Sequence, residues 1–176
     1  MEKSRLFLII NALSFYTYWW FSVWGASIKQ YHIGPLIAII YFIFHFYMIF
    51  DKKKEFQYML LCMFCGFLLE SAFFYFQFID YNGILPDNYS IIPIWVIVLW
   101  GGYALTVYHS FNWIYGKYYS SLMIGGLLGP LIYLSGDRMG CINFQYDAFT
   151  SYLILSPVFA VCFLLLNYFA VKLNND

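Results

Sequence analysis

The chain has 176 residues, of which 63% are hydrophobic and only 10% are charged. Soluble domains are about 45–50% apolar and about 25% charged, so this composition excludes an ordinary water-soluble fold. Nine basic and nine acidic side chains cancel, so no overall field attracts nucleic acid. These properties predict an all-α, polytopic transmembrane helix bundle that forms one integral membrane domain over residues 1–176, with membrane lipids as its partners.

The apolar segments are long enough for about six spans. A bilayer core about 30 Å thick requires about 20 apolar residues in a helix. The predicted spans cover residues 6–26, 33–50, 56–78, 91–113, 118–135 and 150–171. The first follows Lys3 and Arg5, as in a signal peptide, but it is too long, ends in tryptophans and precedes further apolar segments. We therefore expect a retained span.

Basic residues are distributed unevenly between alternating connectors. One side carries seven Lys and Arg residues and the other carries two. The seven are Lys3, Arg5, Lys52, Lys53, Lys54, Lys117 and Lys172, and the two are Lys29 and Arg138. Because retained loops are enriched in both residue types, we expect both termini in the cytoplasm.

Glu70 is the clearest ionisable residue inside a predicted span. Such residues cost about 2.5–3.5 kcal/mol on insertion scales and therefore mark partners or functional sites. Glu70, followed by Ser71, lies about 21 Å along the third span by helical rise. Arg138, which follows Asp137 at the outer end of the fifth span, has a stem long enough to reach inward. Two arrangements remain open: a Glu70–Arg138 pair, or Arg138 bound to Asp137 or to lipid headgroups.

A second polar layer is predicted in the cytoplasmic third of the bundle, where Asn11, His45, His109 and Asn112 fall at similar depths. His109 and Asn112 are three positions apart and would share a helix face, whereas Ser110 would point elsewhere. Neutral imidazole can bind a polar headgroup, relay protons or ligate a metal. No carboxylate or tight ligand spacing supports a metal, so we assign none and favour ordinary interhelical hydrogen bonds.

The fifth span contains a G-x-x-x-G pattern at Gly125 and Gly129, followed by Pro130. Glycines at this spacing let helix backbones approach closely, and proline removes a hydrogen bond and can kink the helix. We favour close packing. The alternative is a broken helix that exposes backbone carbonyls to a substrate, as in transporters.

Several motifs in the chain resemble a known family. They are Gly34-Pro35, Glu70-Ser71, Trp95 to Trp100, His109 to Trp113, and Gly125 to Gly140. Their pattern resembles the uncharacterised bacterial inner-membrane family catalogued as domain of unknown function 2878. The resemblance implies a small multi-pass protein of the bacterial cytoplasmic membrane and supplies no reaction, substrate or cofactor. The association of such proteins with lipid-modifying and stress-response proteins favours a role in membrane lipid metabolism or membrane stress. This chain departs from the family in having Tyr108 before the His-Ser pair.

Three functions remain open from the sequence. A lipid-handling factor, our first choice, predicts a cavity open sideways to lipid. A small-molecule transporter or substrate-capture subunit predicts a water-accessible cavity open to one face, and a structural or assembly protein predicts no cavity. No nucleophile with an adjacent base, phosphate-binding glycine loop or firm metal spacing appears in the sequence, so we assign no reaction and no cofactor.

Overall fold

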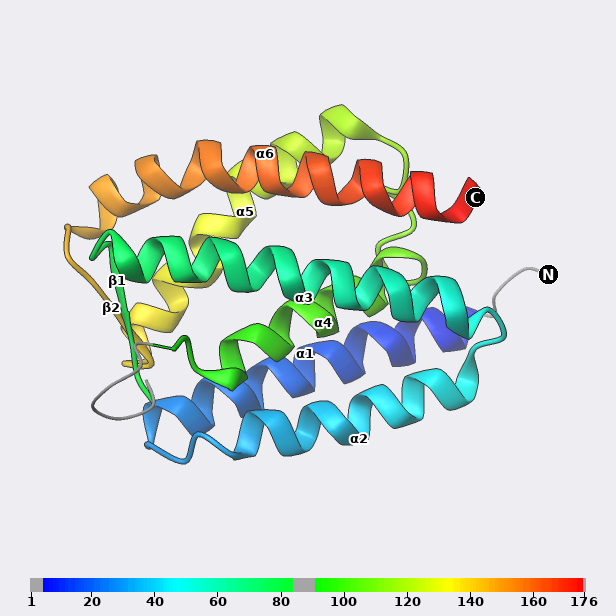
Figure 1. Cartoon of the computed structure of the whole chain (residues 1–176), viewed down its shortest axis with the longest axis horizontal. Helices are drawn as coiled ribbons and strands as arrows, with labels where there is room; N and C mark the ends of the chain where they lie inside the picture. Colours follow the sequence, from blue (N-terminus) through cyan, green and yellow to red (C-terminus); the bar gives the residue numbers. More distant parts are fainter. Residues whose placement is uncertain (1–4, 84–90, 176) are drawn as a thin grey trace.

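The computed structural model describes residues 5–83 and 91–175, which form a bundle of helices capped by a small sheet. In chain order the elements are α1 (Arg5–Ser27), α2 (Ile33–Met48), α3 (Lys52–Tyr75), β1 (Ile79–Tyr81), α4 (Ile94–Val107), α5 (Tyr118–Arg138), β2 (Ile142–Phe144) and α6 (Ala148–Asn175). The helices run back and forth along the long axis, so the start of α1 and the end of α6 lie at the same end of the bundle (Figure 1). The predicted all-α architecture is therefore correct in its main features.

Four of the helices, α1, α3, α5 and α6, are long and apolar enough to cross a membrane. The other two, α2 and α4, are shorter apolar helices of 16 and 14 residues. They end earlier than the predicted spans 33–50 and 91–113. At 1.5 Å per residue, α4 is about 21 Å long, which is less than the hydrocarbon thickness of about 30 Å.

Backbone chemistry explains why α4 is short. Pro93 lies at its N-cap position and Ile94 opens the helix. At its other end the carbonyl of Thr106 accepts backbone hydrogen bonds from His109 at 3.0 Å and from Phe111 at 2.9 Å. These bonds replace the regular helical ladder, so the chain beyond α4 forms a run of turns.

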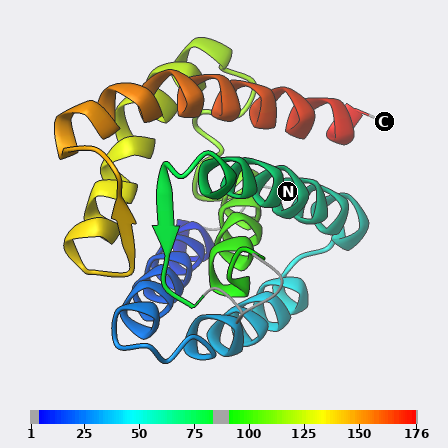
Figure 2. The ribbon, with the colours of Figure 1, turned by 60° about the vertical axis from the view of Figure 1, so that its left-hand side comes forward.

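A two-stranded antiparallel sheet closes the end of the bundle away from the start of α1, and it was not predicted. β1 pairs with β2 so that Asp80 lies opposite Asn143. Ile79, Tyr81 and Ile142 are buried and Asp80 is exposed, which is the alternation expected of a half-buried strand. Figure 2 shows the two strands side by side at this end. The sheet carries Tyr81 into the bundle interior.

The glycines of α5 allow close contact with α6. A Cβ atom at Gly129 would lie 2.7 Å from Cβ of Phe159, and one at Gly125 would collide with the Phe159 carbonyl. The structure thus places the G-x-x-x-G pattern at a helix–helix contact, as the close-packing interpretation requires. The helix continues through Pro130 without a break, so the described chain does not show the broken-helix alternative.

Candidate functional site

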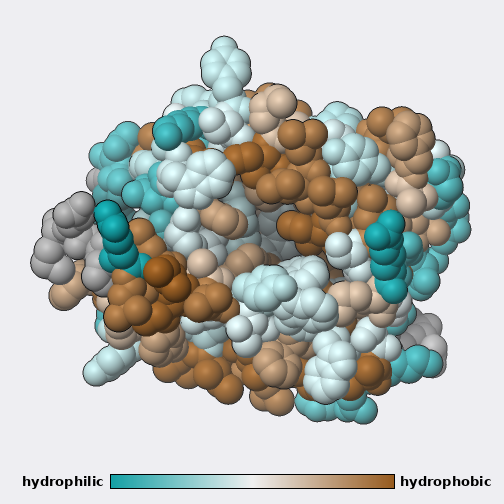
Figure 3. Space-filling model, turned by 180° about the vertical axis from the view of Figure 1, so that it is seen from behind, coloured by the Kyte–Doolittle hydropathy of each residue, from teal (hydrophilic) through white to brown (hydrophobic). Residues whose placement is uncertain are grey.

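An apolar groove, lined by residues from Phe15 to Phe163, lies within the described structure. Its volume is about 220 Å³. It lies between α1, which packs on α2 and α4, and α5, which packs on α6. Along α5 it extends from Ile124 to Gly136, or about 18 Å by helical rise. Figure 3 shows a hollow in the middle of the face opposite to that of Figure 1.

The groove walls are aromatic and aliphatic. Six of the aromatic side chains that line it are Phe15, Trp19, Trp95, Trp100, Phe111 and Trp113. Among the described lining residues, Glu70 alone is acidic or basic. A wall of this kind binds hydrocarbon and gives no path of polar groups to a hydrophilic solute.

Glu70 is fully buried, and both of its carboxylate oxygens have partners. Trp100 Nε1–H donates to Oε1 at 2.8 Å, the Tyr133 hydroxyl also donates to Oε1, and the Tyr81 hydroxyl donates to Oε2. Burial raises the pKa of Tyr81 in β1, so this phenol keeps the proton that it donates. The donors come from α4, α5 and β1, so one carboxylate joins three walls of the groove.

The Glu70–Arg138 pair, one of the two predicted arrangements, is wrong. Arg138 is exposed at the end of α5, and the partners of Glu70 are the three donors just described. Asp137 accepts a hydrogen bond from the backbone of Phe144 at 3.3 Å and so connects α5 to β2. Ser71 is half-buried and lines a second pocket, of about 620 Å³, that is more polar than the groove and lies near the sheet.

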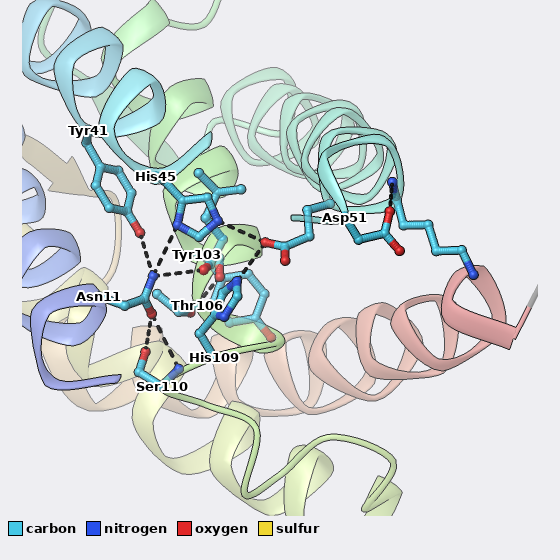
Figure 4. A network of polar contacts seen from close by, with 11 residues as sticks. Asn11, Tyr41, His45, Asp51, Tyr103, Thr106, His109 and Ser110 are labelled. Carbon is cyan, nitrogen blue, oxygen red and sulfur yellow. Dashed lines mark hydrogen bonds and ion pairs between the residues drawn. The ribbon is translucent and has the colours of Figure 1, made fainter. Parts of the chain in front are cut away.

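A second cluster lies at the other end of the bundle, where α1, α2, α3 and the turns after α4 meet. It brings together Asn11, His45 and His109, as the depth estimates predicted (Figure 4). At its centre Glu55 Oε2 lies 2.8 Å from His45 Nε2 and 2.7 Å from His109 Nε2. All four side chains are buried. This group is called the Glu55 cluster below.

Two backbone groups fix the orientation of the Asn11 amide. Its Nδ2–H donates to the carbonyl of Leu105 at 3.1 Å, and its Oδ1 accepts from the backbone N–H of Ser110 at 3.4 Å. A carbonyl only accepts and a backbone N–H only donates, so the amide cannot be flipped. Asn11 Nδ2 therefore directs a hydrogen toward His45 Nδ1, which lies 3.3 Å away.

Glu55 was missed because it ends a run of charged residues that resembles a solvated connector. The Asp51 side chain accepts from the backbone of Lys54 at 3.5 Å and caps α3, so Glu55 falls in the first helical turn. One signal could have revealed it. Glu55 lies three, four and seven positions before the buried residues Tyr58, Met59 and Cys62, and therefore on the inward face of the helix.

Two further predictions about this layer are wrong. Asn112 is exposed and does not share a helix face with His109. Ser110, predicted to point elsewhere, donates from its hydroxyl to Asn11 Oδ1 at 2.7 Å. Both errors have one cause, because α4 ends at Val107 and these residues lie in turns that do not follow helical spacing.

The Glu55 cluster also contains the elements of a metal site. The ligand atoms of His45, Glu55 and His109 all lie within 4.8 Å of one another. The sequence argument against a metal depended on the lack of a carboxylate near the histidines. Glu55 supplies that carboxylate, so that argument no longer holds.

A family model described as a protein of unknown function, DUF2878, matches residues 8–165. The chain belongs to the DUF2878 family. This confirms the resemblance inferred from the sequence motifs. Comparison with curated proteins and comparison with solved structures find no match. The groove and the Glu55 cluster of this DUF2878 protein both lie within the matched residues.

Proposed function

We propose that this DUF2878 protein binds one hydrocarbon chain of a membrane lipid in the groove between α1 and α5, and that it acts in membrane lipid metabolism or in membrane stress. The lining of the groove is the observation that carries the proposal. Sites for compact ligands measure about 300–1,000 Å³. A groove of about 220 Å³ that extends along α5 suits a single extended chain.

The proposal includes a membrane setting with six spans, both termini in the cytoplasm and the inner membrane of a bacterium as the location. The exposed apolar side chains support it. Leu13, Ile43, Leu127 and Val161, from four different helices, are each more than half exposed. Such surface is unfavourable in water and suited to lipid. In the turns that follow the short α4, the backbone N–H groups of His109, Phe111 and Asn112 are hydrogen-bonded, as a membrane requires of irregular backbone.

Glu70 acts as a positioning residue in this proposal. Its carboxylate accepts hydrogen bonds from Tyr81, Trp100 and Tyr133, and all three of these side chains line the groove. Holding these large side chains in one arrangement keeps the groove open. We assign no reaction to Glu70 and no catalytic residue to the chain.

The other two functions considered from the sequence are less well supported. A structural or assembly protein needs no cavity, yet a groove extends along α5. A transporter for a polar solute needs polar groups along its path, whereas the lining of the groove is apolar apart from Glu70 and the side chains that donate to it. Both observations favour an apolar ligand.

A matched pair of substitutions tests the groove. Leu128 lines the groove and Leu127, its neighbour on α5, does not, and both side chains are 51% exposed. Leu128→Trp should fill the groove and reduce binding of a photoreactive acyl-chain lipid about tenfold, equal to about 1.4 kcal/mol. Leu127→Trp should bind as the wild type does. The measurement is crosslinking yield against lipid concentration in nanodiscs.

Cells give the second readout. Lipid extracts are compared from cells with the gene deleted, restored, or restored as either tryptophan variant at equal expression. A lipid change that the wild type and Leu127→Trp reverse and Leu128→Trp does not reverse supports the proposal. Equal crosslinking by both variants, together with unchanged lipids on deletion, contradicts it.

A further inference from the structure

We infer that His45, Glu55 and His109 form a binding site for one divalent transition-metal ion, and that Zn²⁺ is the ion best suited to it. The two Nε2 atoms lie 2.8 and 2.7 Å from the same carboxylate oxygen, Glu55 Oε2. The ligand atoms of the three side chains are all within 4.8 Å of one another. Two imidazoles and one carboxylate are a donor set that Zn²⁺ binds, with a fourth position left for water or substrate.

Small movements convert this cluster into a coordination shell. Ligand atoms of a tetrahedral Zn²⁺ ion lie about 3.3 Å apart, given metal–ligand distances of about 2.0–2.2 Å. The Nε2 and Oε2 atoms must therefore separate by about 0.5 Å, which rotation about the bonds of Glu55 allows. Glu55 stands in the first turn of α3, at an end of the bundle, and its side chain is 9% exposed. An ion can reach it from that end.

A cation would also neutralise the Glu55 carboxylate, whose partners in the metal-free state are the two imidazoles. A buried carboxylate requires a compensating charge or several donors. The nearest basic residue in the sequence, Lys54, donates instead to the backbone carbonyl of Asn174 at 2.8 Å, on the exposed side of α3. A divalent ion bound by Glu55 and two neutral imidazoles supplies the positive charge at the site itself.

Asn11 defines the state of His45 that the ion must change. Because Asn11 Nδ2–H points to His45 Nδ1, the imidazole proton of the metal-free state is on Nε2, facing Glu55. Metal binding moves this proton to Nδ1 and leaves the lone pair of Nε2 for the ion. The same Asn11 Nδ2 already lies 3.5 Å from the Tyr41 hydroxyl, which accepts its hydrogen bond when His45 Nδ1 carries the proton. The backbone contacts of Asn11 remain as they are, so the change stays local.

This inference does not rest on the proposed lipid function. None of the three ligand residues is among the described residues that line the groove. The cluster joins α2, α3 and the turns after α4, whereas the Glu70 contacts join α3, α4, α5 and β1. Each site can therefore fail its test without affecting the other.

The first test measures Zn²⁺ binding to the purified full chain in detergent, by competition with a chromophoric chelator. We expect one Zn²⁺ per chain in the wild type. Loss of the hydrogen-bond partner of a metal ligand typically lowers metal affinity about 10–100-fold. Glu55→Gln and His109→Gln change the ligands themselves, so they should lower the Zn²⁺ affinity by more. His32→Gln is the matched control, because His32 is exposed and lies outside the cluster. Equal binding by all variants overturns the inference.

The second test uses Co²⁺ with the wild type alone, so it does not depend on whether a variant folds. Strong visible d–d absorption without thiolate charge transfer indicates a site of nitrogen and oxygen ligands with low coordination number, as inferred. The weak spectrum of aqueous Co²⁺ overturns the inference. Thiolate charge transfer also overturns it, because it would assign the ion to the free cysteines.

Discussion

At Glu70 a single carboxylate stabilises three large side chains. Replacing it by alanine leaves the donors of Tyr81, Trp100 and Tyr133 buried without that acceptor, and each unsatisfied group costs about 1–3 kcal/mol. Glu70→Gln keeps the shape of the side chain and one carbonyl oxygen as an acceptor. Its new N–H can donate a hydrogen bond to the Tyr81 hydroxyl. We expect Glu70→Ala to destabilise the protein by more than about 3 kcal/mol and Glu70→Gln by about 1–2 kcal/mol.

Buried cysteines provide the measurement for these Glu70 variants. Cys62 and Cys141 are free and buried, so a thiol-reactive fluorophore reports thermal unfolding in detergent. The exposed Arg138 supplies the control, since Arg138→Gln removes the partner once predicted for Glu70 and should leave the melting temperature unchanged. Equal melting temperatures for Glu70→Ala and the wild type would show that the carboxylate does not hold these walls together.

Asp147 makes a separate, pH-dependent contribution at the start of α6. Its carboxylate accepts from the Thr150 hydroxyl at 2.6 Å and from the backbone of Phe149 at 3.0 Å, and these bonds hold the pKa of Asp147 below its ordinary value. A lowered folded-state pKa means that the stabilisation is present at neutral pH and is lost as pH falls through that pKa. Asp147→Ala should therefore melt lower than the wild type at pH 7, and the difference should shrink in acid. A difference that is the same at both pH values contradicts this account.

At the scale of helices, the contact between α5 and α6 depends on glycine. A Cβ at Gly125 collides with the backbone carbonyl of Phe159, which cannot move aside, whereas one at Gly126 lies 3.2 Å from Cβ of Ala160. Gly125→Ala should cost about 1–3 kcal/mol through overpacking. Gly126→Ala is the matched neighbour and should cost clearly less. Melting of the two variants under identical conditions measures the difference, and equal losses would show that the α5–α6 distance is not limited by Gly125.

Apolar length and composition predicted the long helices, because four of them satisfy the same length requirement that a bilayer imposes. They did not predict where α4 ends. That end depends on backbone hydrogen bonds from His109 and Phe111, which follow the helix, to the carbonyl of Thr106. The strands β1 and β2 were missed for a similar reason. Three-residue strands have no stability alone and form only because Ile79 and Tyr81 pack into the bundle.

The candidate sites were also predicted only in part. Depth along the helices correctly grouped Asn11, His45 and His109, because rise per residue is fixed in a regular helix. Depth could not identify the partners of Glu70, which come from a strand and from two other helices. A list of charged residues suggested Arg138, whereas phenol and indole donors solvate this carboxylate. The partners of Glu70 are therefore the Tyr and Trp donors around it and not the basic residue that the sequence suggested.

For the whole molecule, an ion held by three separate segments should stabilise the complete bundle. A ligand that binds only the folded chain raises the free energy of unfolding by about 2.7 kcal/mol when its free concentration is 100 times its Kd. We therefore expect Zn²⁺ to raise the melting temperature of the wild type, followed by intrinsic tryptophan fluorescence because Zn²⁺ can mask thiols. A chelator should reverse the increase. Glu55→Gln should lose it, whereas Leu128→Trp, altered only in the groove, should keep it.

The two sites share one connection, which gives the last prediction. The turns after α4 carry both His109 of the Glu55 cluster and Phe111 of the groove wall. Fixing His109 by a metal ion limits the movement of Phe111, so Zn²⁺ should change the affinity for the acyl-chain lipid, and the lipid should change the affinity for Zn²⁺ by the same factor. Crosslinking with and without Zn²⁺, and Zn²⁺ competition with and without lipid, measure the two factors. Linkage requires that the two factors match at equilibrium, and a factor of one in both experiments would show that the two sites are not coupled.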